Sequence, residues 1–114
     1  MTRDQRGRTN FEIDIRDDVD PPHVRVRGEI DIATVAAFEE GVRTALGAGV
    51  EVVVDMSETT FMDSTGLSAL VRVAGGRSDS EGARPSLVLI APSPPVAKTL
   101  EISGIDRLVT IRDA

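Results

Sequence analysis

Two adjacent hydroxyl residues, Ser64 and Thr65, lie where a helix is predicted to begin. They follow Asp63 and precede Gly66, in a segment that comes after a valine-rich strand. Backbone N–H groups in the first turn of a helix lack partners within the helix and lie at the positive end of its dipole. Negative charge is tolerated there, and a phosphate would also change the surface that a partner protein meets. These residue types therefore favour phosphoryl acceptance at one of the two hydroxyls, Ser64 or Thr65.

Ser64 lacks the sequence neighbours of a catalytic serine. No histidine or lysine is close to it, and the single histidine, His23, falls on an early strand. An unactivated hydroxyl is better suited to receive a phosphoryl group from another protein than to attack a substrate. We therefore expect no catalytic residue and no enzyme activity. The plainer interpretation is that Asp63 caps the helix and that the segment has no further role.

Composition and charge limit the class of partner. The chain has 114 residues, of which 40% are hydrophobic, and this length suits one domain. Its 19 acidic residues outnumber 13 basic ones, giving a formal net charge of −6, and the basic residues form no cluster. Nucleic acid and anionic membranes need concentrated lysine and arginine, so neither is expected as a partner. A basic protein surface would suit the chain better.

No cofactor or metal ion is expected. Cysteine is absent, the Gly75-Gly76 pair lacks the spacing of a phosphate-binding loop, and Asp17, Asp18 and Asp20 lack the pattern of a calcium loop. The first ten residues resemble no secretory signal, and no run of residues is apolar enough to span a membrane. We expect a cytoplasmic protein.

The first half of the chain predicts a hairpin, a helix and a central strand. Apolar residues alternate with polar ones over residues 11–16 and 23–27, which is typical of two strands with one wet face. Asp31 is predicted to cap a helix from about Ala33 to Leu46. Residues 50–54 are too apolar for a half-wet strand, so they predict a covered strand that ends in a polar turn.

The second half predicts alternating helices and strands. A helix runs from about Ser64 to Gly75-Gly76, and residues 78–85 form a polar loop. A strand at 87–90 precedes a short helix that Ser93 caps and Gly104 ends, and residues 108–111 form a last strand. The order predicts an α/β fold with a mixed sheet, opening with a hairpin, parallel at its centre and packed with about three helices. Residues 1–10 are predicted to be a disordered N-terminus and 11–114 a single domain.

Two segments carry a resemblance to a known family. Arg27-Gly28-Glu29-Ile30-Asp31 and Phe61-Met62-Asp63-Ser64-Thr65-Gly66-Leu67 resemble the signature segments of bacterial anti-sigma-factor antagonists, the single-domain STAS proteins. The order of elements is similar from Phe11 to Ile111. The resemblance implies a STAS fold and a role in regulating transcription during stress.

The resemblance also implies partners and a site. The family binds an anti-sigma factor that is also a serine kinase, which frees the sigma factor; phosphorylation by the kinase separates the complex, and a phosphoserine phosphatase restores it. By motif, Ser64 matches the phosphoacceptor. The implied partner-binding residues are Gly28, Glu29, Asp31, Met62, Asp63, Ser64, Thr65 and Gly66.

Alternative interpretations remain open. Gly28 could simply end a strand, Asp31 could only cap a helix, and Phe61 and Met62 could be packing residues. A response-regulator receiver would use Asp55, which closes the valine strand, as its phosphoacceptor, although Pro21-Pro22 and a strand follow Asp17-Asp18 where a receiver has a helix. The chain could also be a STAS interaction module that is never phosphorylated.

Overall fold

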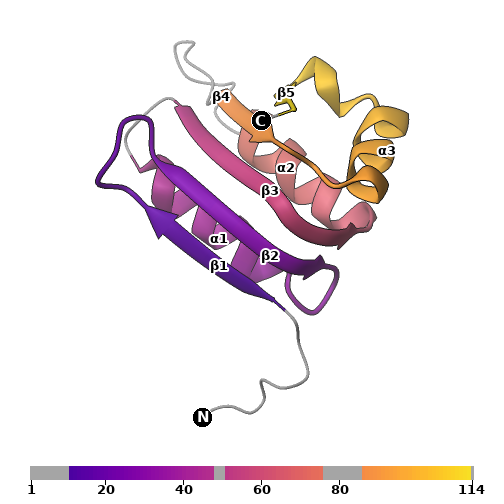
Figure 1. The fold of residues 1–114 in the computed structure, drawn as a ribbon, viewed down its shortest axis with the longest axis horizontal. Coiled ribbons are helices and arrows are strands. Elements are labelled where there is room, and N and C mark those ends of the chain that lie inside the picture. The colour runs from indigo at the N-terminus through magenta and orange to yellow at the C-terminus, as the bar shows by residue number, and fades with distance from the viewer. Residues whose placement is uncertain (1–10, 48–50, 76–85, 114) are drawn as a thin grey trace.

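The computed structural model describes residues 11–47, 51–75 and 86–113, and the chain forms an α/β fold (Figure 1). Its elements are β1 (Glu12–Arg16), β2 (His23–Ile30), α1 (Val35–Leu46), β3 (Glu51–Met62), α2 (Ser64–Gly75), β4 (Ser86–Ile90), α3 (Pro94–Ser103), the 3-10 helix η2 (Ile105–Arg107) and β5 (Thr110–Arg112). The predicted opening hairpin, parallel centre and three helices are confirmed. The predictions for residues 1–10, 78–85, Val50 and Gly76 lie outside the described residues.

The five strands stand in chain order across one sheet. β1 is antiparallel to β2, whereas β2, β3, β4 and β5 are mutually parallel. In Figure 1, α1 and α2 lie behind the sheet, and α3 lies toward the β5 side of it. β2 leads into α1 and β3 leads into α2. Both helices therefore start at the same end of the sheet, where the carboxyl ends of these two parallel strands lie. Among the described residues, no helix has the length and apolarity needed to cross a bilayer.

β3 is much longer than the sequence predicts, because the expected polar turn after Val54 is part of the strand. Its pairing with β2 shifts twice: Arg25 pairs with Asp55 but Arg27 with Glu58, and later Gly28 pairs with Thr59 but Glu29 with Phe61. β3 thus carries one extra residue at each shift. Such bulges break the period-two alternation and bend the strand, which is why this polar stretch does not look like a strand in the sequence.

A buried threonine fastens β3 to its neighbours. Thr59 is fully buried, and its hydroxyl donates to the carbonyl of Val26 on β2 over 2.8 Å. The Thr59 carbonyl accepts the hydroxyl of Ser93 over 2.6 Å. Ser93 is the N-cap residue of α3, with proline at the first turn as predicted, but its side chain makes no cap hydrogen bond and binds β3 instead. The last strand also starts two residues later than predicted, because Leu108 ends η2.

A carboxylate bridges α1 and α2. Glu39 accepts hydrogen bonds from Arg43 on its own helix and from Arg72 on α2, each with a closest N–O distance of 2.8 Å. The bond from Arg72 is the main cause that lowers the pKa of Glu39, and Arg43 adds to it. This pair of contacts helps to hold the two helices side by side.

The first turn of α2 packs unusually close to the sheet. Gly66 is buried, and a Cβ at its position would lie 2.7 Å from Met62 Cγ and 2.9 Å from Ile30 Cγ2. Both atoms belong to buried side chains that have little room to move. A side chain at position 66 would therefore push the start of α2 away from the ends of β2 and β3.

We expect Gly66→Ala to lower the free energy of unfolding. Overpacking costs about 1–3 kcal/mol, which outweighs a gain in helix propensity of up to about 1 kcal/mol. Gly75→Ala is the matched control on the same helix, because a Cβ there would meet nothing within 4 Å. Urea unfolding should show Gly75→Ala to be as stable as the unmodified protein or slightly more so. Equal stability of the two variants would contradict the packing argument.

Candidate functional site

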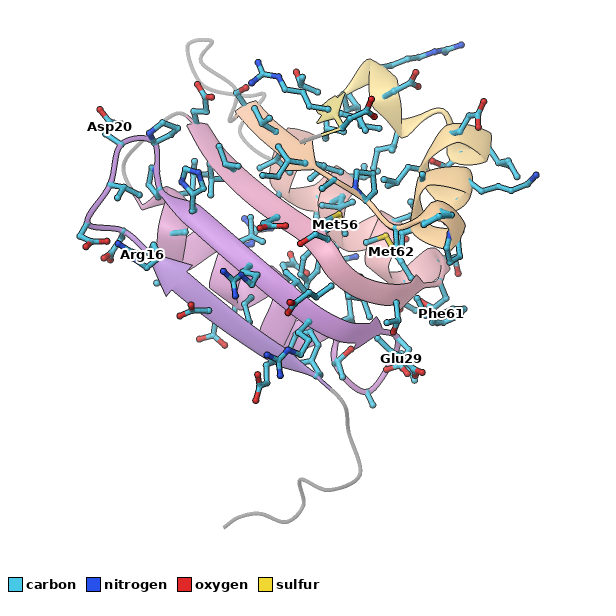
Figure 2. All side chains as sticks on the ribbon, in the orientation of Figure 1. Arg16, Asp20, Glu29, Met56, Phe61 and Met62 are labelled. Carbon is cyan, nitrogen blue, oxygen red and sulfur yellow. The ribbon has the colours of Figure 1, made fainter. Side chains whose placement is uncertain are left out.

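The two segments singled out in the sequence lie side by side at the edge where β2 and β3 end. Glu29 pairs with Phe61 and Ile30 with Met62 in the parallel register. The Asp63 N–H then donates to the Ile30 carbonyl over 3.2 Å, one residue before α2 begins. Figure 2 shows Glu29 and Phe61 near each other at this end of the sheet.

Asp63 caps α2, as predicted. One of its carboxylate oxygens, Oδ1, accepts the Thr65 N–H over 2.9 Å and the Thr65 hydroxyl over 2.5 Å. The Asp63 carbonyl accepts the N–H groups of Gly66 and Leu67. The first turn of α2 is therefore organised almost wholly by this one residue.

The hydrogen bond from the Thr65 hydroxyl is the main cause that lowers the pKa of Asp63. Burial is the next largest effect and raises that pKa, whereas the backbone N–H groups of Thr65 and Gly66 lower it further. A lowered pKa means that these bonds stabilise the fold at any pH above the ordinary aspartate pKa. That contribution is lost as the pH falls through the lower pKa of the folded state. At neutral pH, the capping group is a carboxylate.

Ser64 and Thr65 are adjacent but chemically distinct. Ser64 is the first residue of α2, it is exposed, and its hydroxyl makes no hydrogen bond with any part of the chain that the structure describes. The Thr65 hydroxyl is half-buried and bound to Asp63. A visiting active site can thus reach the Ser64 oxygen directly, whereas the Thr65 oxygen is already engaged.

A tight turn joins β2 to α1 and corrects the role predicted for Asp31. Asp31 does not cap the helix, which starts at Val35 instead of Ala33. Its Oδ1 accepts the Ala33 N–H over 3.0 Å within the turn, and its carbonyl accepts the N–H groups of Thr34 and Val35. The chain folds over the Asp31 carbonyl before the helix forms, which the sequence pattern does not reveal.

Thr34 locks this turn onto the end of β2. Its hydroxyl donates to the Glu29 carbonyl over 2.8 Å and accepts the Asp31 N–H over 3.0 Å. Thr34 itself is buried. The residues between Asp31 and Thr34 are therefore held in one conformation.

The other residues expected to bind a partner divide by exposure. Glu29 is exposed and Asp31 is half-buried, so both contribute to the surface. Gly28, Met62 and Gly66 are buried, so these three residues contribute to packing instead of to the surface. Gly28 does not end a strand; it lies inside β2 with φ of 101°, at the second register shift, where glycine is favoured.

Two exposed apolar residues at this edge were missed or misjudged from the sequence. Ile32 is 78% exposed in the turn before α1, and Phe61 is 46% exposed at the end of β3. Phe61 faces outward because the second bulge adds a residue before it and returns Met62 to the core. The sequence signal that could have predicted an exposed apolar residue is the position of Ile32, an isoleucine between Asp31 and Thr34.

The candidate residues of the alternative functions lie elsewhere. Asp55 is within β3, where its Oδ1 accepts the Ser57 N–H over 2.9 Å, so it does not close a strand as a receiver aspartate would. His23 begins β2, at the opposite end from Ile30. That separation is about 23 Å at the rise of a strand, so His23 is not placed to activate Ser64.

Comparison with known proteins identifies the family. The family model described as Mlab, STAS domain matches residues 13–110. The chain belongs to the STAS domain family. This confirms the resemblance read from the two signature segments.

Relatives of this STAS domain include anti-sigma factor antagonists. It is 29% identical over 106 residues to the anti-sigma-B factor antagonist of Listeria monocytogenes, covering 91% of this chain and 90% of the relative, and the Listeria innocua protein matches equally. The solved structure of the anti-sigma factor antagonist SpoIIAA in its unphosphorylated form is 26% identical, with a TM-score of 0.63 over 89% of this chain and 86% of that one. An anti-sigma factor antagonist from Mycobacterium paratuberculosis shares the fold, with a TM-score of 0.73, 23% identity and coverage of 91% and 86%.

We expect Thr65→Val to raise the pKa of Asp63 toward its ordinary value, because the substitution removes the hydroxyl donor while keeping the shape of the side chain. NMR titration of the Asp63 carboxyl carbon measures this directly. The variant should also have a lower free energy of unfolding than the unmodified protein at pH 7. This difference in free energy should shrink as the pH falls below the pKa of Asp63 in the folded state. Thr60→Val, an exposed threonine on β3, is the control and should leave the Asp63 pKa unchanged. An Asp63 pKa equally low in both variants would contradict the assigned cause.

Proposed function

We propose that this STAS domain is an anti-sigma factor antagonist that works by partner switching. In its unmodified form it binds an anti-sigma factor with serine-kinase activity and so frees the sigma factor. The kinase then phosphorylates Ser64, the complex separates, and a phosphoserine phosphatase restores the binding form. The names of the curated and solved relatives support this function, and one of those structures is described as an unphosphorylated form.

The observation that carries the proposal is the exposed hydroxyl of Ser64, which has no hydrogen-bond partner among the described residues, beside the engaged hydroxyl of Thr65. In the transfer step, the Ser64 oxygen attacks the terminal phosphorus of ATP held by the kinase. The bond from that phosphorus to the bridging oxygen breaks, ADP leaves, and the hydroxyl proton passes to a base on the kinase. This chain supplies only the nucleophile, in line with a non-enzymatic role.

Phosphorylation acts on the partner surface more than on the fold. The phosphate adds about −1.5 to −2 charge at pH 7, next to the Asp63 carboxylate. The start of α2 tolerates that charge because of the helix dipole, whereas a docked protein meets it directly. A loss of about 3–4 kcal/mol would weaken binding several hundredfold.

The test begins with copurification from the native cell, followed by mass spectrometry of the partner and of the peptide that contains Ser64. With that kinase in hand, Ser64→Ala should bind as the unmodified chain does and take up no label from ATP. Ser64→Asp should bind at least tenfold more weakly, because a carboxylate is an incomplete phosphate mimic. Thr65→Ala should still be labelled at Ser64, although its cap is altered.

Other outcomes point to the alternatives. Equal affinity of the Ser64-phosphorylated and unmodified proteins would contradict the switch and favour an interaction module that binds constitutively. Labelling of Asp55 by acetyl phosphate and magnesium would favour a receiver.

A further inference from the structure

The edge that carries Ser64 also presents two apolar side chains to solvent. Ile32 is 78% exposed and Phe61 is 46% exposed. Glu29 pairs with Phe61 on the neighbouring strand, and Ile32 follows Glu29 by three residues. The Asp63 N–H donates to the Ile30 carbonyl, which joins the two segments. Ile32, Phe61 and Ser64 thus belong to one edge, which we call the docking edge.

Ile32 is presented by a rigid turn. The residues on either side of it are fixed: Ala33 donates its N–H to the Asp31 carboxylate, and the buried Thr34 ties the turn to the Glu29 carbonyl. A backbone held in place before binding loses little conformational freedom when a partner covers the side chain that it carries. Burial of this exposed isoleucine therefore contributes transfer free energy at little further cost in backbone ordering.

The two segments that carry these side chains are acidic. Residues 29–34 and 61–68 contain Glu29, Asp31 and Asp63 and no lysine, arginine or histidine. A second copy of this chain would place its own three carboxylates against these, so self-association through the docking edge is disfavoured. A surface with lysine or arginine around an apolar hollow is complementary.

We propose that Ile32 is the apolar anchor of the docking edge, with Phe61 beside it, and that the partner receives Ile32 in an apolar pocket rimmed by lysine and arginine. The inference rests on the proposed function, because it describes how the same anti-sigma factor kinase recognises the unmodified chain. It adds a residue outside both signature segments and states the chemistry of the partner surface. Ser64 controls whether the complex forms, and Ile32 supplies affinity.

Calorimetry with the kinase identified above tests the anchor. Ile32→Ala should weaken binding about 10- to 100-fold, and Ile32→Leu should retain affinity to within about threefold. The matched control is Ile102→Ala, since Ile102 is 74% exposed at the end of α3 and lies outside the docking edge. Circular dichroism and thermal unfolding should show all three variants to be folded.

Salt dependence tests the charged rim. Glu29→Gln should weaken binding and reduce the dependence of Kd on salt between 50 and 500 mM NaCl. Glu101→Gln, next to Ile102 on α3, is the charge control and should leave the affinity and its dependence on salt unchanged.

The outcomes separate this inference from the proposed function. If Ile32→Ala binds as well as Ile102→Ala while Ser64→Asp binds weakly, the anchor is wrong and the switch stands. If Ile32→Ala binds weakly while the Ser64-phosphorylated protein binds as the unmodified one does, the anchor stands and the switch fails. If the unmodified chain binds no anti-sigma factor kinase, both are overturned.

Discussion

The parallel pairing of β2 with β3 is the constraint on which the rest of the site depends. β3 stays paired with β2 to its end. The last pair, Ile30 with Met62, brings the segments that follow the two strands, 32 residues apart in sequence, to one end of the sheet. The bond from the Asp63 N–H to the Ile30 carbonyl closes this junction. Without it, the acceptor serine and the turn before α1 would not share a surface.

The two bulges in β3 make this pairing possible. Each adds a residue to β3 without moving β2, and Gly28 absorbs the second shift through its positive φ. One result is that Phe61 faces solvent while Met62 enters the core. The irregularity is therefore the means by which the fold orients the site, which agrees with the placement of bulges near functional regions in other sheets.

The signature segments combine packing with surface chemistry. Gly66 lets α2 approach Met62 and Ile30, and Asp63 uses its carboxylate and carbonyl to organise the first turn. This arrangement engages Thr65, whereas the Ser64 hydroxyl is exposed and has no hydrogen-bond partner in the ranges 11–47, 51–75 and 86–113. The proposed switch needs no rearrangement of the fold, because the charge is added to a surface that is already rigid and already acidic.

The sequence alone determined the fold class, the two signature segments and the cap at Asp63, because these depend on local periodicity and on residue types near a helix start. It did not determine where β3 ends, that Asp31 forms a turn, or that the Ser93 side chain binds β3 instead of the first turn of α3. Those features depend on partners far along the chain: Val26 for Thr59, Glu29 for Thr34 and Thr59 for Ser93. Exposure of Ile32 and Phe61 was likewise decided by tertiary structure, since a residue's contact with solvent depends on which distant segments pack around it.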